Sequence, residues 1–239
     1  MRLATYNVHH GAPTRGPVDL DRTIEVCRVL DADLLAVQEL DSGVARSGGI
    51  DQPRALSTRL GLHAAFAAPV RIGEDGRYGH ALFARHPLTA VEQIELTVTP
   101  GREHRTALLA TVELDGTLVE VCALHLENPR RADGARPTAL EQARFAFDLI
   151  VARAERSGRP AVVLGDLNVD PARIEPLATA AGFDLAAGSP TFPSRRPRVR
   201  IDHVAVRGLR IEATDVPASE ASDHRPLLVL AVPDRGPLA

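Results

Sequence analysis

The sequence of 239 residues contains no tryptophan and no lysine, and aromatic residues make up only 3% of it. A folded core must therefore be packed from Leu, Val, Ala and Ile rather than from aromatic rings. All 28 basic residues are arginine, and together with 31 acidic residues they give a formal net charge of −3. This balance excludes an overall basic field that would draw the whole molecule onto nucleic acid or an anionic membrane.

Cysteine and long apolar runs are equally scarce. The two cysteines, Cys27 and Cys122, lie in apolar segments without the number or spacing of a disulfide framework or a zinc site, which predicts buried free thiols. No apolar run approaches the ~20 residues that a membrane-spanning helix needs. The first residues lack the basic region and apolar stretch of a secretion signal. We therefore expect a cytoplasmic monomer without a transmembrane segment.

The hydrophobic pattern predicts many strands and few helices. Strands are predicted at 2–10, 33–39, 62–70, 78–85, 88–98, 105–114, 117–125, 161–164, 199–206, 209–214 and 227–232. Helices are predicted at 19–30, 137–156 and 171–181, with another short helix ending near 60–61. A chain of this length suits one large domain or two small ones, and no linker or solenoid repeat interrupts it, so we expect one domain over 1–239.

The segment 165–168 is chemically the most informative. It follows the short apolar strand 161–164 and places Asp166 and Asn168 two positions apart. Along an extended chain these side chains point the same way, so a carboxylate and an amide would face one space beyond the strand. The alternative interpretation is a turn in which Asn168 caps a helix that begins near Asp170.

Other predicted strands also end in polar residues with useful chemistry: Asn7, Glu39, His125, Asp202 with His203, and Asp223 with His224. Strand ends at one edge of a sheet lie side by side, so these groups can converge in a single cleft. Carboxylates dominate and thiolates are absent, which favours a hard cation such as Mg²⁺ or Mn²⁺. The sequence lacks the spacing of a zinc protease, a glycine-rich phosphate loop and a serine or cysteine nucleophile motif.

Seven segments together resemble the endonuclease/exonuclease/phosphatase superfamily, in the order and spacing of that family and over nearly the whole chain. They are Thr5-Tyr-Asn7-Val, Val37-Gln-Glu39, Tyr78-Gly-His80-Ala-Leu, His125-Leu, Gly165-Asp166-Leu-Asn168, Arg200-Ile-Asp202-His203 and Ser222-Asp223-His224-Arg225-Pro226. Small bacterial stand-alone members share the loop Arg46-Ser-Gly-Gly-Ile-Asp51-Gln and the stretch Thr191-Phe-Pro-Ser. The resemblance implies an α/β protein with a four-layered α/β/β/α sandwich of two packed sheets flanked by helices.

The resemblance also implies roles for individual residues. Glu39 would be the principal ligand of Mg²⁺ or Mn²⁺, with Asn7 beside it and Asp223 as a further candidate. Asp166 would orient or deprotonate the attacking water. The remaining roles follow the same pattern: Asn168 and His125 would bind phosphoryl oxygens, His224 would act as general base or proton donor, and Asp202 would fix its tautomer.

Substrate contacts are predicted for Tyr78, His80, Arg105 and Arg200. His80 stands where many relatives carry Asn, and the two arginines are candidate phosphate clamps, although a solvated edge is the alternative for the arginine-rich stretch 195–200. His203 replaces a common Tyr and is expected to be a packed strand residue. His9 and His10 could reach the cleft or could be ordinary loop residues.

The predicted function is a divalent-metal-dependent phosphoesterase that cleaves a phosphodiester or phosphomonoester by direct water attack. The substrate is expected to be a small phosphorylated metabolite or a phospholipid headgroup. A metal-dependent nuclease is the alternative, disfavoured because the net charge is acidic and tryptophan is missing. A non-catalytic phosphate-binding module on the same fold is the second alternative, and it predicts gaps among the polar strand-end residues.

Overall fold

The structure, a computed structural model, describes residues 1–128 and 138–234. The strands are β1 (Arg2–Asn7), β2 (Leu34–Ser42), β3 (His63–Ile72), β4 (Gly76–Ala84), β5 (Thr89–Leu96), β6 (Arg105–Leu114), β7 (Thr117–His125), β8 (Ala161–Asp166), β9 (Asp184–Leu185), β10 (Asp202–Arg207), β11 (Leu209–Asp215) and β12 (Leu227–Pro233). The helices are α1 (Leu20–Leu30), α2 (Gln52–Leu60), α3 (Thr138–Ser157) and α4 (Pro171–Ala180), and short 3-10 turns cover His9–Gly11 and Ala45–Ser47.

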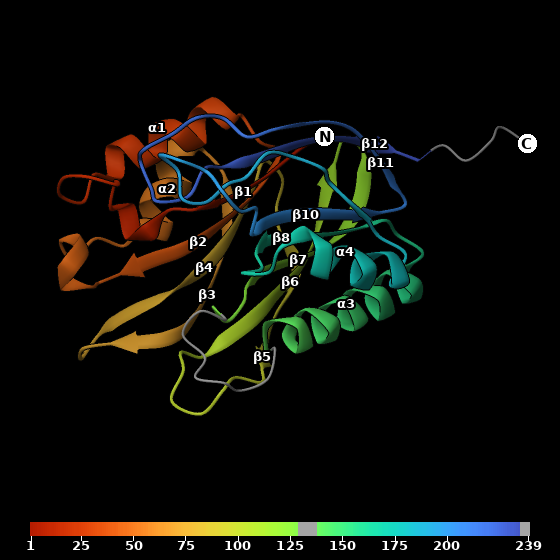
Figure 1. The fold of residues 1–239 in the computed structure, drawn as a ribbon, viewed down its shortest axis with the longest axis horizontal. Coiled ribbons are helices and arrows are strands. Elements are labelled where there is room, and N and C mark those ends of the chain that lie inside the picture. Colours follow the sequence, from red (N-terminus) through yellow and green to blue (C-terminus); the bar gives the residue numbers. More distant parts are fainter. Residues whose placement is uncertain (129–137, 235–239) are drawn as a thin grey trace, which may run out of the picture.

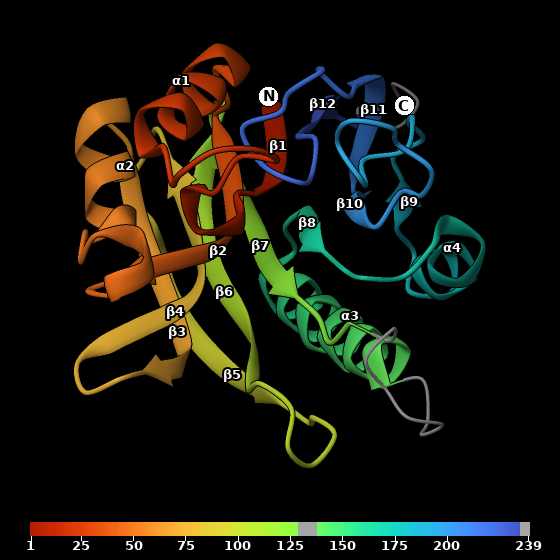
Figure 2. The ribbon, with the colours of Figure 1, turned by 60° about the vertical axis from the view of Figure 1, so that its left-hand side comes forward.

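Two sheets of six strands pack face to face, with helices on both outer faces (Figure 1). The strand orders are β11-β12-β1-β2-β4-β3 and β5-β6-β7-β8-β10-β9. Figure 2 shows α1 and α2 beside the first sheet, and α3 and α4 on the opposite side beside the second. The predicted four-layered α/β/β/α sandwich is confirmed.

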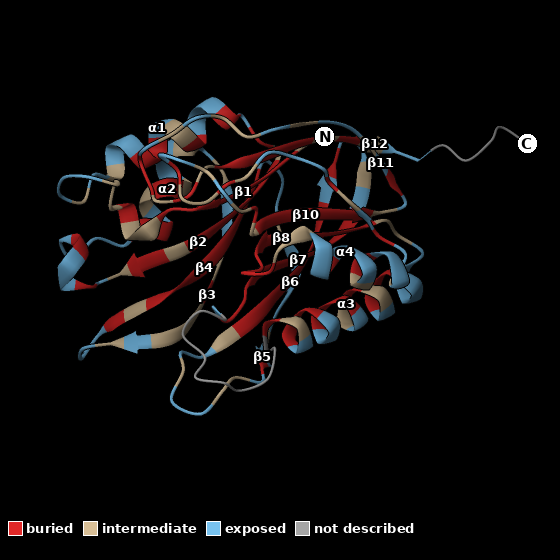
Figure 3. Cartoon of the chain, in the orientation of Figure 1, coloured by how far each residue is buried: buried red, intermediate tan, exposed pale blue. Residues whose placement is uncertain are grey.

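Three apolar clusters hold the layers together. One lies between the sheets and includes Leu34, Val121 and Val229. The second joins the second sheet to α3 and α4, and the third joins the first sheet to α1 and α2. Figure 3 shows the central strands buried and the outer faces of the helices exposed. Cys27 and Cys122 are buried free thiols in these clusters, as predicted.

Several elements differ in extent from their predictions. β1 ends at Asn7, because His9 and His10 both adopt left-handed backbone conformations in a 3-10 turn. β2 continues past Glu39 to Ser42, through a register shift between Gln38 and Leu40. The two-residue strand β9 was not predicted. The predicted helix start at 137 lies outside the described residues.

No helix among the described residues is long and apolar enough to cross a membrane.

The sandwich brings two parallel strand pairs to one edge. β1 pairs with β2 and β7 pairs with β8 in parallel, while the other paired strands run antiparallel. A parallel pair requires a crossover, and α1 and α3 provide it in the two sheets. In the second sheet His125, Asp166 and Asp202 lie directly across from one another on three neighbouring strands. Polar residues from both sheets therefore face the same space.

Gly165 is required where β8 passes β7. Its φ is +151°, and a Cβ atom at this position would lie 2.0 Å from the carbonyl oxygen of Leu124. A side chain would force the two strands apart directly beside Asp166, which is the next residue. Gly116, in the turn between β6 and β7, also has a positive φ of +75°, but no atom lies within 4 Å of its Cβ position.

We therefore predict that Gly165→Ala lowers the free energy of unfolding by at least about 3 kcal/mol, since the clash involves a neighbouring backbone. The control Gly116→Ala should cost only about 1 kcal/mol, the strain of a left-handed alanine. Urea unfolding followed by circular dichroism measures both. Equal losses for the two variants would contradict the close packing of β7 and β8.

Candidate active site

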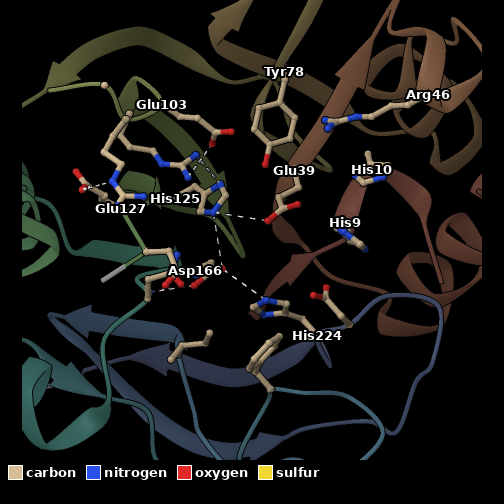
Figure 4. Close-up of a pocket in the computed structure, with 18 residues that line it drawn as sticks. His9, His10, Glu39, Arg46, Tyr78, Glu103, His125, Glu127, Asp166 and His224 are labelled. Carbon is tan, nitrogen blue, oxygen red and sulfur yellow. Dashed lines mark hydrogen bonds and ion pairs between the residues drawn. The ribbon is translucent and has the colours of Figure 1, made fainter. Parts of the chain in front are cut away.

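A cavity of about 530 Å³ opens at the edge where the two parallel pairs end. Figure 4 shows side chains of both sheets pointing into it, with Glu39 from the first sheet and His125 and Asp166 from the second. The loop before β12 contributes Asp223 and His224. The cavity therefore collects residues from segments far apart in the sequence.

Asp166 lies at the bottom of this cavity and is only 1% exposed. Its Oδ2 accepts a hydrogen bond of 3.0 Å from Asn7 Nδ2, and its Oδ1 accepts one of 3.0 Å from the backbone N–H of Asn168. The Nε2 atoms of His125 and His224 each lie 3.8 Å from Oδ2. Burial raises the pKa of Asp166, and nearby Asp202 raises it further, to about 7.

His224 is oriented by Asp202. Its Nδ1 lies 2.8 Å from Asp202 Oδ2, and both residues are buried. Burial alone would lower the pKa of His224, but the carboxylates of Asp202 and Asp166 outweigh burial and raise it to about 10. His224 is therefore protonated at neutral pH, and its Nε2–H faces Asp166 and the cavity. A charged donor at this position can bind an oxyanion.

Glu39 occupies the bulge of β2 with a φ of +62°. This left-handed conformation is uncommon for a residue other than glycine and interrupts the alternation of the strand. Its Oε1 accepts a hydrogen bond of 3.0 Å from Asn7 Nδ2 and lies 3.9 Å from His125 Nε2. Asn7 therefore faces both carboxylates with its amide nitrogen, while its Oδ1 accepts the backbone N–H of His9 at 3.1 Å.

His125 is held as a neutral donor. Arg105 approaches its Nδ1 at 3.3 Å, and because a guanidinium can only donate, Nδ1 accepts and Nε2 carries the proton. Burial lowers the pKa of His125 well below its ordinary range, and the positive charge of Arg105 adds to this effect. Glu103 pairs with Arg105 at 3.1 Å. The Nε2–H of His125 is thus directed between Glu39 and Asp166 without bonding either.

Asn168 follows β8 in a left-handed conformation, with a φ of +52°. Its Nδ2 donates to the carbonyl oxygen of Leu126 at 3.0 Å, which fixes the amide at the cavity wall. Because its backbone N–H also bonds Asp166, Asn168 is both a turn residue and a cavity residue. The residue that precedes α4 as its N-cap is Asp170, so the predicted helix cap at Asn168 is wrong, whereas the predicted convergence of Asp166 and Asn168 on one cavity holds.

Tyr78, Arg105 and Asp223 also line the cavity, whereas two further candidates do not. The Arg200 guanidinium donates to the carbonyl oxygen of Ala186 at 2.6 Å and is buried away from the cavity. His80 is 2% exposed, and burial lowers its pKa to about 4. His203 packs in β10, with Nε2 2.7 Å from the Val169 carbonyl oxygen.

Arg46 is a cavity residue to which the sequence assigned no role. Asp41 holds its guanidinium through two hydrogen bonds of 2.9 and 2.8 Å, and its Cζ lies 5.1 Å from the centre of the Tyr78 ring. The sequence feature that could have identified Arg46 is the loop that begins with it, which resembles a loop of small bacterial family members. The loop between β5 and β6 adds Arg102 and Glu103, for which the sequence carried no signal.

Ligand atoms for a metal ion come together in two groups of three among the described residues. One group is His9, His10 and Glu39, and the other is Asp166, Asp202 and His224. In the second group the direct contact between Nδ1 of His224 and Asp202 already uses one ligand atom of each. Glu39 of the first group lies on the cavity wall and is half-buried, so its carboxylate remains open to solvent.

A profile of the Endonuclease/Exonuclease/phosphatase family matches residues 4–224, and the chain belongs to this family. A UPF0294 protein of Vibrio cholerae is 41% identical over 78 residues, which cover 29% of this chain and 27% of that protein. The chain thus aligns with about a quarter of the length of that curated relative.

Two solved structures show the same fold. An endonuclease/exonuclease/phosphatase protein of Beutenbergia cavernae has a TM-score of 0.81 at 24% identity, over 100% of this chain and 73% of that one. The mannosyl-6-phosphatase of Bacteroides thetaiotaomicron has a TM-score of 0.73 at 16% identity, over 97% and 99% of the two chains.

We predict that Asp202→Asn lowers the pKa of His224 from about 10 toward its ordinary value of 6.5, because the main partner that favours the charged ring is removed. The titration is measured by NMR of the imidazole in protein treated with EDTA. The raised pKa also contributes stability that is fully present below pH 6.5 and is lost as pH rises through about 10. The stability difference between wild type and variant should therefore shrink over that interval, and an unchanged His224 pKa would contradict the pairing.

Proposed function

We propose that this protein is a divalent-metal-dependent phosphoesterase that hydrolyses a small phosphorylated molecule by direct attack of water. The observation that carries the proposal is the surroundings of Asp166. A buried carboxylate with a raised pKa lies 3.8 Å from two imidazole nitrogens that carry protons toward the same cavity. This combination of a base and preorganised donors suits a reaction in which negative charge grows on phosphoryl oxygens.

The side chains divide the chemistry among themselves. Asp166 accepts a proton from the attacking water, since its pKa of about 7 matches a general base working near neutral pH. The water oxygen forms a new bond to phosphorus while the bond from phosphorus to the ester oxygen breaks, and the departing alkoxide takes up a proton from solvent. His224, His125 and Asn168 donate to the non-bridging oxygens.

This assignment of roles leaves His224 as a proton donor, which is one of the two roles predicted for it. A histidine whose pKa is raised to about 10 is already protonated and cannot act as a general base at neutral pH. It serves instead as a charged hydrogen-bond donor, and Asp202 keeps it in that state. Asp166 is left as the base.

A divalent cation at Glu39, when bound, would polarise a phosphoryl oxygen and neutralise developing charge. Glu39 fits this role because it lies on the cavity wall and its side chain remains 22% exposed. Mg²⁺ and Mn²⁺ are the expected ions.

The rim of the cavity supports a small anionic substrate. Arg46, Arg102 and Arg105 line it, and the first is fixed by Asp41 in a position from which it can bind a second anionic group. The volume of about 530 Å³ is in the range of small-molecule sites. The likeness to a mannosyl-6-phosphatase adds support for a phosphorylated metabolite.

We predict that the purified protein releases phosphate or an alcohol from a panel of phosphoesters in the presence of Mg²⁺ or Mn²⁺. Asp166→Asn and His224→Gln should each lower kcat by about 10²–10³-fold, as loss of a preorganised group does. Asp184→Asn, an exposed carboxylate of β9 outside the cavity, is the matched control and should retain full activity.

The panel contains sugar phosphates, nucleotides, lysophospholipids, single-stranded DNA and bis-p-nitrophenyl phosphate. Preference for DNA would replace the metabolite proposal with the nuclease. Metal binding without turnover of any member would support the non-catalytic module. Full activity of either active-site variant would overturn the catalytic assignment.

A further inference from the structure

Two histidines lie beside Glu39 and have no role in the chemistry above. One ring nitrogen each of His9 and His10 and one carboxylate oxygen of Glu39 all lie within 4.8 Å of one another. Figure 4 shows both histidines on the side of Glu39 opposite His125. All three residues are half-buried and line the cavity, so an ion from solvent can reach them.

Hydrogen bonds hold the backbone of the 3-10 turn His9–Gly11, whereas its two imidazole rings form none with the described residues. His9 N–H donates to Asn7 Oδ1 at 3.1 Å, and the carbonyl oxygen of His10 accepts from Gln52 Nε2 at 2.8 Å. The two rings meet edge to face, with their centres 4.5 Å apart. No hydrogen bond to another described residue uses a ring nitrogen of His9 or His10. An unprotonated ring nitrogen of each histidine can therefore donate a lone pair to a ligand.

We propose that His9, His10 and Glu39 together bind one divalent transition-metal ion. The proposal rests on the proposed function in one respect, which is that Glu39 serves as the carboxylate ligand in both. It differs in the partners of Glu39: two imidazoles take the place of the predicted amide ligand Asn7. Asn7 presents nitrogen to Glu39, and an amide N–H cannot ligate a cation.

This ligand set determines which ions the protein prefers. Mg²⁺ favours oxygen ligands and retains its waters, whereas Mn²⁺ and Zn²⁺ accept imidazole nitrogen readily. A site of two imidazoles and one carboxylate leaves coordination positions open for water or a phosphoryl oxygen. The chain should therefore bind Mn²⁺ and Zn²⁺ more tightly than Mg²⁺.

The direct test uses Mn²⁺ as a paramagnetic probe of the metal-free protein. Electron spin echo spectroscopy detects nitrogen nuclei bonded to the ion, and we expect imidazole nitrogen couplings in the wild-type protein. His9→Asn and His10→Asn should each weaken or remove a coupling. Asparagine is chosen because it tolerates the left-handed backbone of this turn, where φ is 46° and 47°.

Calorimetry gives the matching affinities. Substitution of residues that only orient a metal ligand costs about 10–100-fold in affinity. Loss of a ligand should therefore raise the Kd for Mn²⁺ or Zn²⁺ by at least about tenfold, while the Kd for Mg²⁺ changes less. The matched control is His63→Asn with His86→Asn, two exposed histidines outside the cavity, for which no affinity should change.

The outcomes separate this inference from the proposed function. Absence of nitrogen coupling in wild-type protein that still hydrolyses phosphoesters would overturn the histidine ligands alone. Unchanged Zn²⁺ affinity in both histidine variants would do the same. Nitrogen coupling in a protein without hydrolytic activity would support the metal site and contradict the enzyme. The wild-type spectrum decides the question even where a variant fails to fold.

Discussion

One amide group joins the two halves of this protein at its active edge. Asn7 Nδ2 donates at 3.0 Å to Glu39 of one sheet and at 3.0 Å to Asp166 of the other. Asp166 is buried and Glu39 is half-buried, and a shared donor offsets the repulsion between the two neighbouring carboxylates. Ser222 Oγ donates to the backbone carbonyl oxygen of Asn7 at 2.7 Å, so the loop that carries His224 is fixed to the same residue. The cavity depends on this arrangement.

The chemistry follows from how burial and charge act on neighbouring groups. Asp166 and His224 face each other, yet both have raised pKa values. Burial raises the pKa of the carboxylate, whereas for the imidazole the combined attraction of Asp202 and Asp166 outweighs the opposing effect of burial. In the proposed mechanism, the first acts as a base near neutral pH and the second as a charged hydrogen-bond donor. Enzymes often use the local environment to shift the pKa values of two titratable groups differently, so that the two groups take different roles.

Periodicity predicted most of the strands and helices, and the family resemblance implied the layers of the sandwich. Strand-end chemistry predicted several polar residues of the cavity, because this signal lies in the local sequence. Other features depend on tertiary contacts that have no local signature. The bulge that turns Glu39 inward and the amide orientation of Asn7 belong to this class. The burial of Arg200 against the Ala186 carbonyl oxygen likewise arises from packing, so the arginine-rich stretch 195–200 could not reveal that the arginines lining the cavity come from other loops and strands.

The most direct measurement is the pKa of Asp166 itself, obtained by ¹³C NMR titration of its carboxyl carbon in metal-free protein. The account predicts a value well above the ordinary 3.8, near 7. Asn7→Ala should raise it further, since the hydrogen bond from Asn7 favours the charged form. A pKa near 4 in the wild-type protein, unaffected by Asn7→Ala, would contradict the central claim that the buried carboxylate of Asp166, hydrogen-bonded by Asn7 of the other sheet, is the base of this site.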